Sequence, residues 1–510
     1  MNTKRFNQVF FSLFGGALFV ATVLFCLSPF NALAKPAYFT ASVIRYVDSN
    51  GTDISNVCTA SVTPCQTIQH TVDLSQDGDE IRVAAGTYSD MNNYSGLAQI
   101  VYISKTLSII GGYTTTNWNT SNPSTNLTTL DAQNSGRVMY ITGNISPSIQ
   151  GLHITGGNSY GLGGDPWQAQ DAGGGLYIIT ATAQISGNWI LNNTASYGTG
   201  GGIFLNQSKS VLNSNIISGN TSGSFGGGIS IWFSDALIND NVIANNNTNG
   251  VFLYGYTPTF ERNLITGNIG PGLNFYYGWA YLNGNTITAN HAYYGGGISL
   301  ITFSGAIMNG NIITGNYAAS KGGGLYVSWH SYAYLNNDLV ADNQTDGSGS
   351  GIYAEGATIQ VVHTTIARNN GGNGSGIYIG GPTGPYGLYY STVVLTNTIL
   401  VSHSVGISVT GGNTVSINSL LWYKTPITIS KAITAVIETQ HQYYGDPVLA
   451  ADGYHLMSGS LAINKGLLTS LKTDIDSDLR PDGCFPDLGA DEYISGVQCK
   501  YIYLPLALKN

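Results

Sequence analysis

Glycine and aliphatic residues recur in one short phrase along the middle of the chain. Up to three glycines are followed by an aliphatic residue, any residue and a second aliphatic residue, as in residues 200–205. The last glycine of successive copies falls at positions 175, 202, 228, 250, 272, 297, 324, 351, 376 and 406. The phrase therefore repeats about every 26 residues, a period typical of stacked repeat architectures.

A second phrase, Asn-x-aliphatic-x-x-Asn, runs in phase with the first. Its copies begin at Asn188, Asn215, Asn241, Asn263, Asn285 and Asn311, and two further copies, each with one substitution, begin at Asp338 and Thr364. Between the phrases, alternating apolar positions predict short strands with one side facing inward. Glycine allows sharp turns at positive φ, and asparagines at the same turn of successive coils can stack as an amide ladder. The pattern predicts an all-β fold, a parallel β-helix (solenoid) with about one coil per repeat.

The N-terminal end of such a stack needs a cap, because it would otherwise expose unpaired strand edges. Ile68 and Val72 lie four residues apart in the segment 67–74, which predicts a short amphipathic helix. We expect this helix to cover the first coil.

Two groups of motifs carry a family resemblance. Residues 46–48, 64–68, 78–83 and 85–88 resemble the N-terminal segment of pectin-lyase-like, right-handed parallel β-helix proteins. Gly445-Asp446-Pro447, Tyr454-His455-Leu456, Leu479-Arg480-Pro481 and the run 487–492 resemble the closing region of the choice-of-anchor Q group of exported β-helix proteins. The resemblance implies a secreted or surface protein and carries no catalytic motif onto this chain.

The sequence divides into five predicted segments. They are a signal peptide (1–34), a cap with the first coils (35–137), the β-helix repeats (138–445), a closing region (446–495) and a terminal tail with a sorting motif (496–510). The signal peptide is predicted from Lys4 and Arg5, an apolar stretch and the small residues Ala32 and Ala34. An uncleaved membrane anchor is the alternative for the first segment, and a final strand is the alternative for the tail. We expect a secreted or cell-surface protein with no membrane span once the signal is removed.

Composition and cysteine usage agree with export. Only 9% of the residues are charged and the net charge is −9, so nucleic acid is not an expected partner. Four cysteines remain after the signal, in two close pairs that favour the disulfides Cys58–Cys65 and Cys484–Cys499, although four cysteines allow three connectivities. Zinc is the competing interpretation, but no histidine stands at ligand spacing near either pair.

The residues of the repeats give little support to an enzymatic function. Polysaccharide lyases need a base beside calcium-binding carboxylates, and glycosidases need paired carboxylates on one face. The acidic residues of successive coils do not fall at one position. Asp165 and Asp171, which flank Trp167 in an insertion between repeats, are the only weak catalytic candidates, and a solvated loop is the alternative.

Aromatic residues give a stronger functional prediction. If the aliphatic residue after each glycine points inward, the next residue points outward, and many of these outward residues are aromatic. We predict a ligand-binding ladder made of Tyr177, Phe204, Trp232, Phe252, Tyr254, Tyr276, Tyr326, Trp329 and Tyr353. The turns beyond add Tyr256, Tyr277, Trp279, Tyr332 and Tyr334. Flat rings beside Asn and Ser suit sugar rings, whereas packing under loops is the structural alternative.

One metal site is predicted near the C-terminus. Asp474, Asp476 and Asp478 alternate in a short loop, a spacing that can wrap calcium, with turn-capping aspartates as the alternative. No other cofactor is expected. The sequence thus predicts a monomeric extracellular β-helix that binds polysaccharide or a cell-surface glycan. A lyase or glycoside hydrolase with loop-borne carboxylates and a non-catalytic surface spacer are the alternatives.

Overall fold

The computed structural model describes residues 42–166, 170–381, 389–494 and 496 of the 510-residue chain. Residues 1–41 and 42–510 are separate units, and everything described belongs to the second. The predicted signal peptide, Trp167, Cys499 and residues 497–510 of the predicted tail lie outside the described residues.

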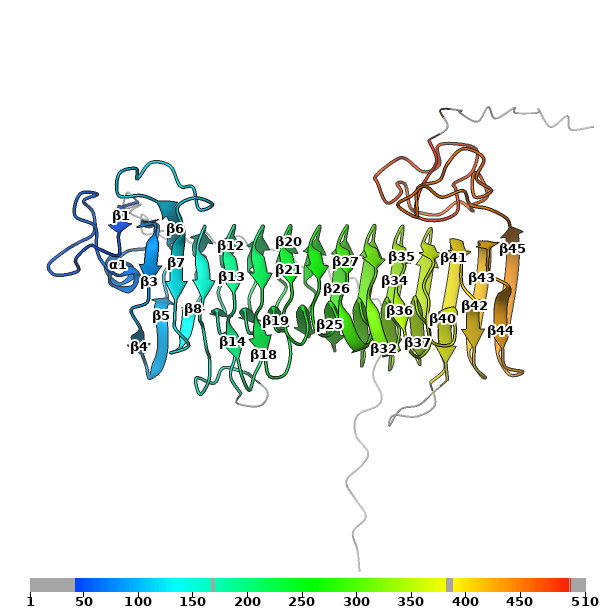
Figure 1. The fold of residues 1–510 in the computed structure, drawn as a ribbon, viewed down its shortest axis with the longest axis horizontal. Coiled ribbons are helices and arrows are strands. Elements are labelled where there is room, and N and C mark those ends of the chain that lie inside the picture. Colours follow the sequence, from blue (N-terminus) through cyan, green and yellow to red (C-terminus); the bar gives the residue numbers. More distant parts are fainter. Residues whose placement is uncertain (1–41, 167–169, 382–388, 495, 497–510) are drawn as a thin grey trace, which may run out of the picture. The chain divides into compact units, whose positions relative to one another are not determined.

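One 14-stranded sheet forms the first wall of a parallel β-solenoid (Figure 1). Its strands pair in parallel from one coil to the next, apart from an antiparallel pair at the N-terminal end. In order they are β4 (Asn92–Tyr94), β5 (Leu97–Ile103), β8 (Arg137–Thr142), β11 (Leu176–Ile179), β15 (Ile203–Asn206), β19 (Ile229–Trp232), β22 (Val251–Tyr254), β25 (Leu273–Tyr276), β29 (Ile298–Ile301), β33 (Leu325–Ser328), β37 (Ile352–Glu355), β40 (Ser375–Gly380), β42 (Val405–Val409) and β44 (Ile427–Lys431).

A 26-stranded sheet forms the other walls and consists of two parallel rows. The first row contains β1 (Ile44–Val47), β2 (Glu80–Ala84), β6 (Ser108–Tyr113), β9 (Ser148–Gln150), β12 (Gln184–Ser186), β16 (Val211–Asn213), β20 (Leu237–Asn239), β23 (Thr259–Glu261), β26 (Trp279–Asn283), β30 (Gly305–Asn309), β34 (Tyr332–Asn336) and β38 (Thr358–Val362). The second contains β3 (Gly86–Tyr88), β7 (Thr128–Asp131), β10 (His153–Thr155), β13 (Trp189–Leu191), β17 (Ile216–Ser218), β21 (Val242–Ala244), β24 (Leu264–Thr266), β27 (Thr286–Thr288), β31 (Ile312–Thr314), β35 (Leu339–Ala341) and β39 (Thr365–Ala367). The rows merge in the long strands β41 (Thr392–Val401), β43 (Thr414–Tyr423) and β45 (Val436–Tyr444). The predicted all-β, right-handed parallel β-helix is thereby confirmed.

The alternation of side chains builds the core as the sequence predicts. Ile203 and Leu205 of β15 point into the main hydrophobic core, whereas Phe204 between them belongs to a separate cluster outside the sheet. The glycines before the strands let neighbouring coils approach closely. A Cβ atom at Gly201 would lie 2.2 Å from the carbonyl oxygen of Thr221, so this position excludes any side chain.

Two buried asparagine ladders run along the solenoid, which confirms the predicted stacking. The Nδ2 of Asn188 donates to the Oδ1 of Asn215 at 3.1 Å, and the Nδ2 of Asn193 donates to the Oδ1 of Asn220 at 3.1 Å. The same contacts repeat coil by coil. The first ladder ends at Asp338, and the second ends where Asn369 meets His403.

The two ends of the described solenoid differ, because a helix covers the first coils whereas most residues of the last strand, β45, are exposed. The predicted helix is α1 (Ile68–Leu74), which begins at the N-cap Thr67 and buries Ile68 and Val72 against the first coils. At the other end, residues 446–494 fold back over the second row without forming a strand (Figure 1). Leu456 and Leu488 there join a cluster with Ile399 of β41.

Short strands also pair beside the main walls. They are β14 (Thr194–Ala195) with β18 (Thr221–Ser222), and β28 (His291–Tyr294) with β32 (Tyr317–Lys321) and β36 (Gln344–Thr345). They belong to the segments that lead into the 14-stranded sheet. Among the described residues, no helix is long and apolar enough to cross a membrane.

Candidate ligand-binding surface

Most of the predicted aromatic ladder points outward but is buried. Tyr177, Phe204, Trp232 and Phe252 form one cluster on the outer face of the 14-stranded sheet, with exposed fractions of 6%, 0%, 2% and 3%. Tyr326 and Tyr353 are buried in the same way further along the sheet. The predicted direction of these rings is correct, and the prediction that they form an open binding face is wrong.

The physical reason is a layer of chain outside the sheet. The hydroxyl of Tyr177 donates to the carbonyl of Gly164 at 3.1 Å, and the ring of Phe225 stacks on Phe252 with centroids 4.4 Å apart. Both partners come from segments that precede a strand of the sheet. These segments cross the outer face and seal the rings, and this burial raises the pKa of Tyr177 to about 12.

A half-buried ion pair belongs to the same covering layer. The Nζ of Lys321 lies 2.7 Å from the Oε2 of Glu355, and the hydroxyl of Tyr326 donates to the same oxygen at 3.2 Å. The Nζ of Lys321 also lies 4.9 Å from the ring centroid of Tyr353. These contacts bind β32 to the sheet and fix the rings as part of the fold.

A second set of aromatic residues remains exposed at the turn that follows the 14-stranded sheet. We call it the turn strip: Phe233, Tyr254, Tyr256, Tyr276, Tyr277, Phe303, Trp329, His330 and Tyr389. Exposed fractions are 56% for Tyr256, 41% for Tyr277 and 48% for Phe303. Tyr254, Tyr276 and Trp329 of the predicted ladder are half-buried at its edge.

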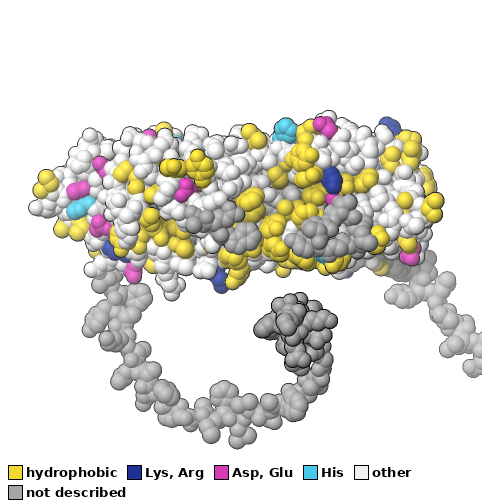
Figure 2. All heavy atoms as spheres, turned by 90° about the horizontal axis from the view of Figure 1, so that it is seen from below, with side chains coloured by type: hydrophobic (Ala, Val, Ile, Leu, Met, Phe, Trp, Pro, Cys, Tyr) yellow, Lys and Arg dark blue, Asp and Glu magenta, His cyan; other side chains and the backbone are white. Residues whose placement is uncertain are grey.

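The rings of the turn strip follow one another along the solenoid axis. The rings of Tyr254 and Tyr276 stack with centroids 6.1 Å apart, and those of Tyr277 and Phe303 at 5.9 Å. Phe303 then stacks on His330 at 4.9 Å, and His330 meets Tyr389 edge to face. Members of the strip follow five successive strands, β19, β22, β25, β29 and β33, or roughly 19 Å at about 4.8 Å per coil, and Tyr389 lies in the segment after β40. One side of the solenoid shows hydrophobic side chains gathered over its middle part (Figure 2).

The backbone of the turn strip is strained. In the 14-stranded sheet, the residue directly after each strand from β11 to β37 has positive φ. These residues are Thr180, Gln207, Phe233, Gly255, Tyr277, Thr302, Trp329 and Gly356. Gly255 and Gly356 show that glycine satisfies this turn, whereas Phe233 and Tyr277 adopt φ values of 48° and 55°. Bulky side chains rarely occupy this region, at a cost of about 1–3 kcal/mol each. Thr180, Gln207 and Thr302 share this conformation, so positive φ belongs to the turn itself, and the aromatic side chains are what distinguish the strip.

Charged groups are scarce at the turn strip. Among the residues that the structure describes, no ion pair involves a member of the strip. Asp235 lies close by, but its Oδ1 accepts the backbone N–H of Thr257 at 2.9 Å. A paired carboxylate arrangement of the glycosidase kind is therefore not evident there.

Another pair of stacked aromatic rings lies where the strands β26 and β34 of the first row begin. The indole ring of Trp279 stacks on the ring of Tyr332 with centroids 5.6 Å apart, although Gly305 of the coil between separates them in the sheet. A Cβ atom at Gly305 would lie 2.6 Å from the indole. Glycine at this position thus lets the ring of Trp279 lie flat across the intervening coil.

The two catalytic candidates lie elsewhere. Asp171 is 6% exposed, and its Oδ1 accepts the backbone N–H of Gly163 at 3.1 Å. The backbone N–H of Asp165 donates to the carbonyl of Gln170. Asp171 therefore closes its own loop beside Tyr177, and a catalytic role for this pair stays a prediction.

The predicted calcium loop uses its first aspartate, Asp474, to cap backbone groups. The Oδ1 of Asp474 accepts the N–H groups of Asp476 and Asp478 at 3.0 and 2.8 Å, and its Oδ2 accepts the N–H of Glu492 at 2.9 Å. These contacts match the turn-capping alternative. Calcium binding by Asp474, Asp476 and Asp478 stays a prediction.

Another group of potential metal ligands adjoins this loop. The ligand atoms of His455, Asp476 and Asp491 all lie within 4.8 Å of one another, and Asp452 lies 2.7 Å from the Nδ1 of His455. Burial raises the pKa of Asp491 to about 6. Partial burial opposes the protonation of His455, but the hydrogen bond and charge of Asp452 outweigh it and raise the pKa of His455. The sequence analysis missed this set because its members are far apart along the chain.

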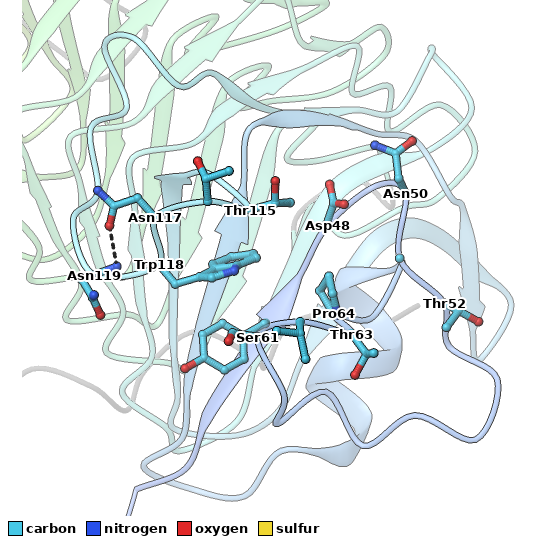
Figure 3. A pocket seen from close by; sticks show the side chains of 14 residues that line it. Asp48, Asn50, Thr52, Ser61, Thr63, Pro64, Thr115, Asn117, Trp118 and Asn119 are labelled. Carbon is cyan, nitrogen blue, oxygen red and sulfur yellow. Dashed lines mark hydrogen bonds between the residues drawn. The ribbon is translucent and has the colours of Figure 1, made fainter.

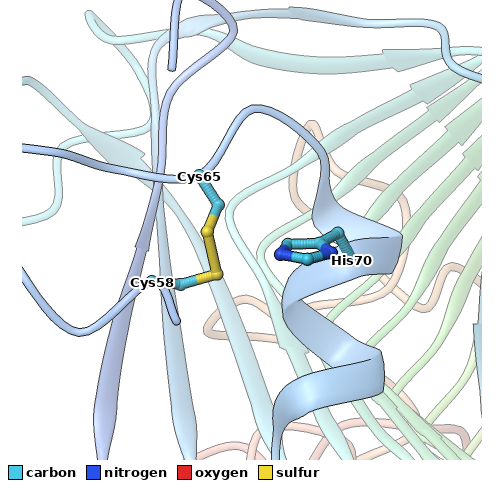
Figure 4. Close-up of side chains that lie close together, drawn as sticks. All are labelled: Cys58, Cys65 and His70. Carbon is cyan, nitrogen blue, oxygen red and sulfur yellow. A yellow bond between two sulfur atoms is a disulfide. The ribbon is translucent and has the colours of Figure 1, made fainter. Parts of the chain in front are cut away.

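The first cysteine pair forms the predicted disulfide (Figure 4). Cys58 and Cys65 are bonded, so their sulfur atoms are not free thiolates for zinc, and the Nε2 of the neighbouring His70 lies 3.0 Å from the carbonyl oxygen of Asn56. The zinc alternative is wrong for this pair. The Cys484–Cys499 pair stays a prediction, because Cys499 lies outside the described residues.

Comparison with protein families agrees with this architecture. No protein with curated annotation matches the sequence. Similar solved structures include the pectate lyase Pel9A (13% identity, TM-score 0.35, covering 89% of this chain and 97% of that one) and XylC in complex with xylose (10%, 0.42, 88% and 98%). A third is PfbA, a surface adhesin of Streptococcus pneumoniae (8%, 0.33, 72% and 84%). Residues 168–291 and 227–420 match the family described as right handed beta helix region, and the stacked coils of the described chain have the fold of that family.

Proposed function

We propose that this protein is an exported, non-catalytic β-helix that binds polysaccharide along the turn strip. The observation that carries the proposal is a row of exposed and half-buried aromatic rings along a turn where two coils have glycine instead. Sugar rings present apolar faces that pack on aromatic rings, while their hydroxyl groups remain in water. Export is inferred from the charged and apolar pattern of residues 4–34 and agrees with the disulfide.

Replacing Tyr277 and Phe303 with glycine is expected to weaken polysaccharide binding about 5-fold to 150-fold. Each ring contact contributes about 0.5–1.5 kcal/mol, so two lost rings remove about 1–3 kcal/mol of binding free energy. Both residues have positive φ, which glycine adopts readily, and Gly255 and Gly356 already occupy the position of Tyr277 on their coils. Binding is measured by pull-down and depletion assays on residues 35–510 with cellulose, chitin, xylan, pectin and alginate.

The matched control replaces Tyr197 and Tyr444 with glycine. Both are exposed, at 66% and 63%, and lie outside the turn strip. Retained binding in the Tyr277 and Phe303 variant, or equal loss in the control, would contradict the proposal. Failure of the native chain to bind any of the five polysaccharides would favour the spacer alternative, which the burial of the predicted ladder supports. Release of reducing or unsaturated sugar would favour the enzyme alternative.

A further inference from the structure

The N-terminal end of the solenoid contains a cavity of about 790 Å³ that is separate from the turn strip. Three segments line it: residues 46–52, 61–64 and 115–119 (Figure 3). The first two belong to the stretch between β1 and α1, which the Cys58–Cys65 disulfide closes. The third belongs to the loop between β6 and β7, so the fold brings together segments more than 50 residues apart.

A buried carboxylate faces this cavity without a partner. Asp48 lines the cavity and is 9% exposed. Its backbone is engaged, because its N–H donates to the carbonyl of Cys65 at 2.9 Å and its carbonyl accepts the N–H of Gly51 at 2.7 Å. Its side chain accepts no hydrogen bond from any residue that the structure describes. Its carboxylate oxygens are not among the buried atoms that lack a partner, so they stay open to the cavity and a ligand there can reach them.

A second polar group at the cavity is also unsatisfied. Trp118 is 8% exposed, and its indole Nε1–H is buried without a hydrogen-bond partner. The loop around it is well fixed, since the N–H of Asn117 donates to the carbonyl of Thr114 at 3.0 Å and Arg82 donates to the carbonyl of Trp118. The indole N–H has no accessible surface, so the cavity offers the carboxylate of Asp48 as an acceptor and the ring of Trp118 as an apolar face, each held in place by backbone contacts.

Aromatic and hydroxyl groups complete the lining. The rings of Tyr46 and Trp118 meet edge to face with centroids 5.1 Å apart and form a corner of the cavity. The other side chains are mostly short and polar: Asn50, Thr52, Ser61, Thr63, Thr115, Thr116, Asn117 and Asn119. Such a lining suits a ligand with several hydroxyl groups.

The charged residues around the cavity indicate which class of ligand it can bind. The arginines of this region pair with other acids, Arg45 with Asp79 at 3.0 Å and Arg82 with Glu80 at 2.6 Å. No described cation pairs with Asp48, so acidic sugars would be repelled. An ammonium group would satisfy the carboxylate and would also be attracted to the faces of the neighbouring rings. We propose that this cavity binds an amino sugar with a free ammonium group, through the carboxylate of Asp48 and the ring of Trp118.

Titration of residues 35–510 with glucosamine, N-acetylglucosamine and galacturonic acid tests the proposal, with calorimetry as the readout. Glucosamine is expected to bind at least about tenfold more tightly than the other two, because only its ammonium group makes a charge-assisted hydrogen bond to Asp48. In the Asp48→Asn variant this preference for glucosamine over N-acetylglucosamine is expected to disappear. Trp118→Ala removes the ring and should weaken both of these sugars.

Asp90→Asn is the matched control, since Asp90 is an exposed carboxylate of the same region outside the cavity lining. Thermal unfolding verifies that each variant is folded. Absence of glucosamine binding to the native chain, or an unchanged preference in a folded Asp48→Asn variant, would overturn the proposal. The Tyr277 and Phe303 variant is expected to keep glucosamine binding, so this proposal and that of the turn strip can fail separately.

Discussion

Replacing Asn263 with alanine is expected to lower the free energy of unfolding by about 3–5 kcal/mol. Asn263 is 1% exposed and stands in the middle of the first asparagine ladder. Its Oδ1 accepts the backbone N–H and the Nδ2 of Asn241 at 3.0 and 3.1 Å. Its Nδ2 donates to the carbonyl of Ile238 at 2.8 Å and to the Oδ1 of Asn285 at 2.9 Å.

The size of this effect follows from what alanine would leave behind. A methyl group satisfies none of the four contacts, and the partner groups on the neighbouring coils are too deeply buried to turn to water. Each unsatisfied buried group costs about 1–3 kcal/mol. Because each coil of a solenoid is stabilised by its neighbours, the loss at one coil also loosens the next.

Urea unfolding followed by far-UV circular dichroism measures the change, and hydrogen exchange at the amide of Asn241 localises it. The control is Asn283→Ala on the neighbouring coil, since Asn283 is half-buried and its side chain makes no hydrogen bond with a described residue. Its effect is expected to stay within about 0.5 kcal/mol. Similar losses in the two variants would show that the ladder does not stabilise the fold as described.

The repeat structure of the sequence carries most of the information about the fold. The glycine and asparagine phrases stay in phase over the coils, and each has a clear physical role: glycine where coils meet backbone to backbone, asparagine where a buried turn needs both a donor and an acceptor. The inward and outward assignment was correct for Ile203, Phe204 and Leu205. Helix α1 also forms where Ile68 and Val72 predict it.

The exposure of the aromatic ladder could not be predicted in the same way. Alternation along a strand tells which side of the sheet a ring occupies, but not whether another layer of chain covers that side. The covering layer comes from the segments before each strand, such as those carrying Gly164 and Phe225. The glycine runs at their ends carry no side chains to keep these segments away from the sheet.

Sites formed by segments that are far apart along the chain could not be predicted from the sequence either. Asp48 and Trp118 share a cavity only because the loop between β6 and β7 folds against the segment that follows β1. His455 and Asp491 come together because the closing region turns back on itself. No periodic pattern relates these positions, and without a repeat the sequence offers no register from which to infer their proximity.

Asp338 is the residue at which the first ladder departs from asparagine, and it predicts an unusual pH dependence. Its Oδ1 accepts the backbone N–H and the Nδ2 of Asn311 at 2.7 and 2.9 Å, and its Oδ2 accepts the N–H of Asn336 at 2.9 Å. Complete burial outweighs these three hydrogen bonds and raises the pKa of Asp338 from 3.8 to about 7.

The sign of the effect follows from proton linkage. Between about pH 4 and pH 7 the folded protein keeps a proton on Asp338 that the unfolded chain has lost. The stability contributed by this group is therefore fully present below about pH 4, falls as the pH rises, and is lost once the pH passes about 7. A shift of about three units corresponds to a loss on the order of 4 kcal/mol.

Asp338→Asn is expected to remove this dependence. The variant loses the acceptor for the N–H of Asn336, and this cost does not change with pH. Because the variant has no titrating group at this position, its stability relative to the native chain should rise by several kcal/mol from pH 4.5 to pH 7.5. Urea unfolding at both pH values measures this difference, and the exposed Asp90→Asn supplies the same charge change without burial. If the difference between the Asp338→Asn and native chains were equal at the two pH values, Asp338 would have to be ionised throughout. The three hydrogen bonds of Asp338 would then compensate the full cost of burying its charge.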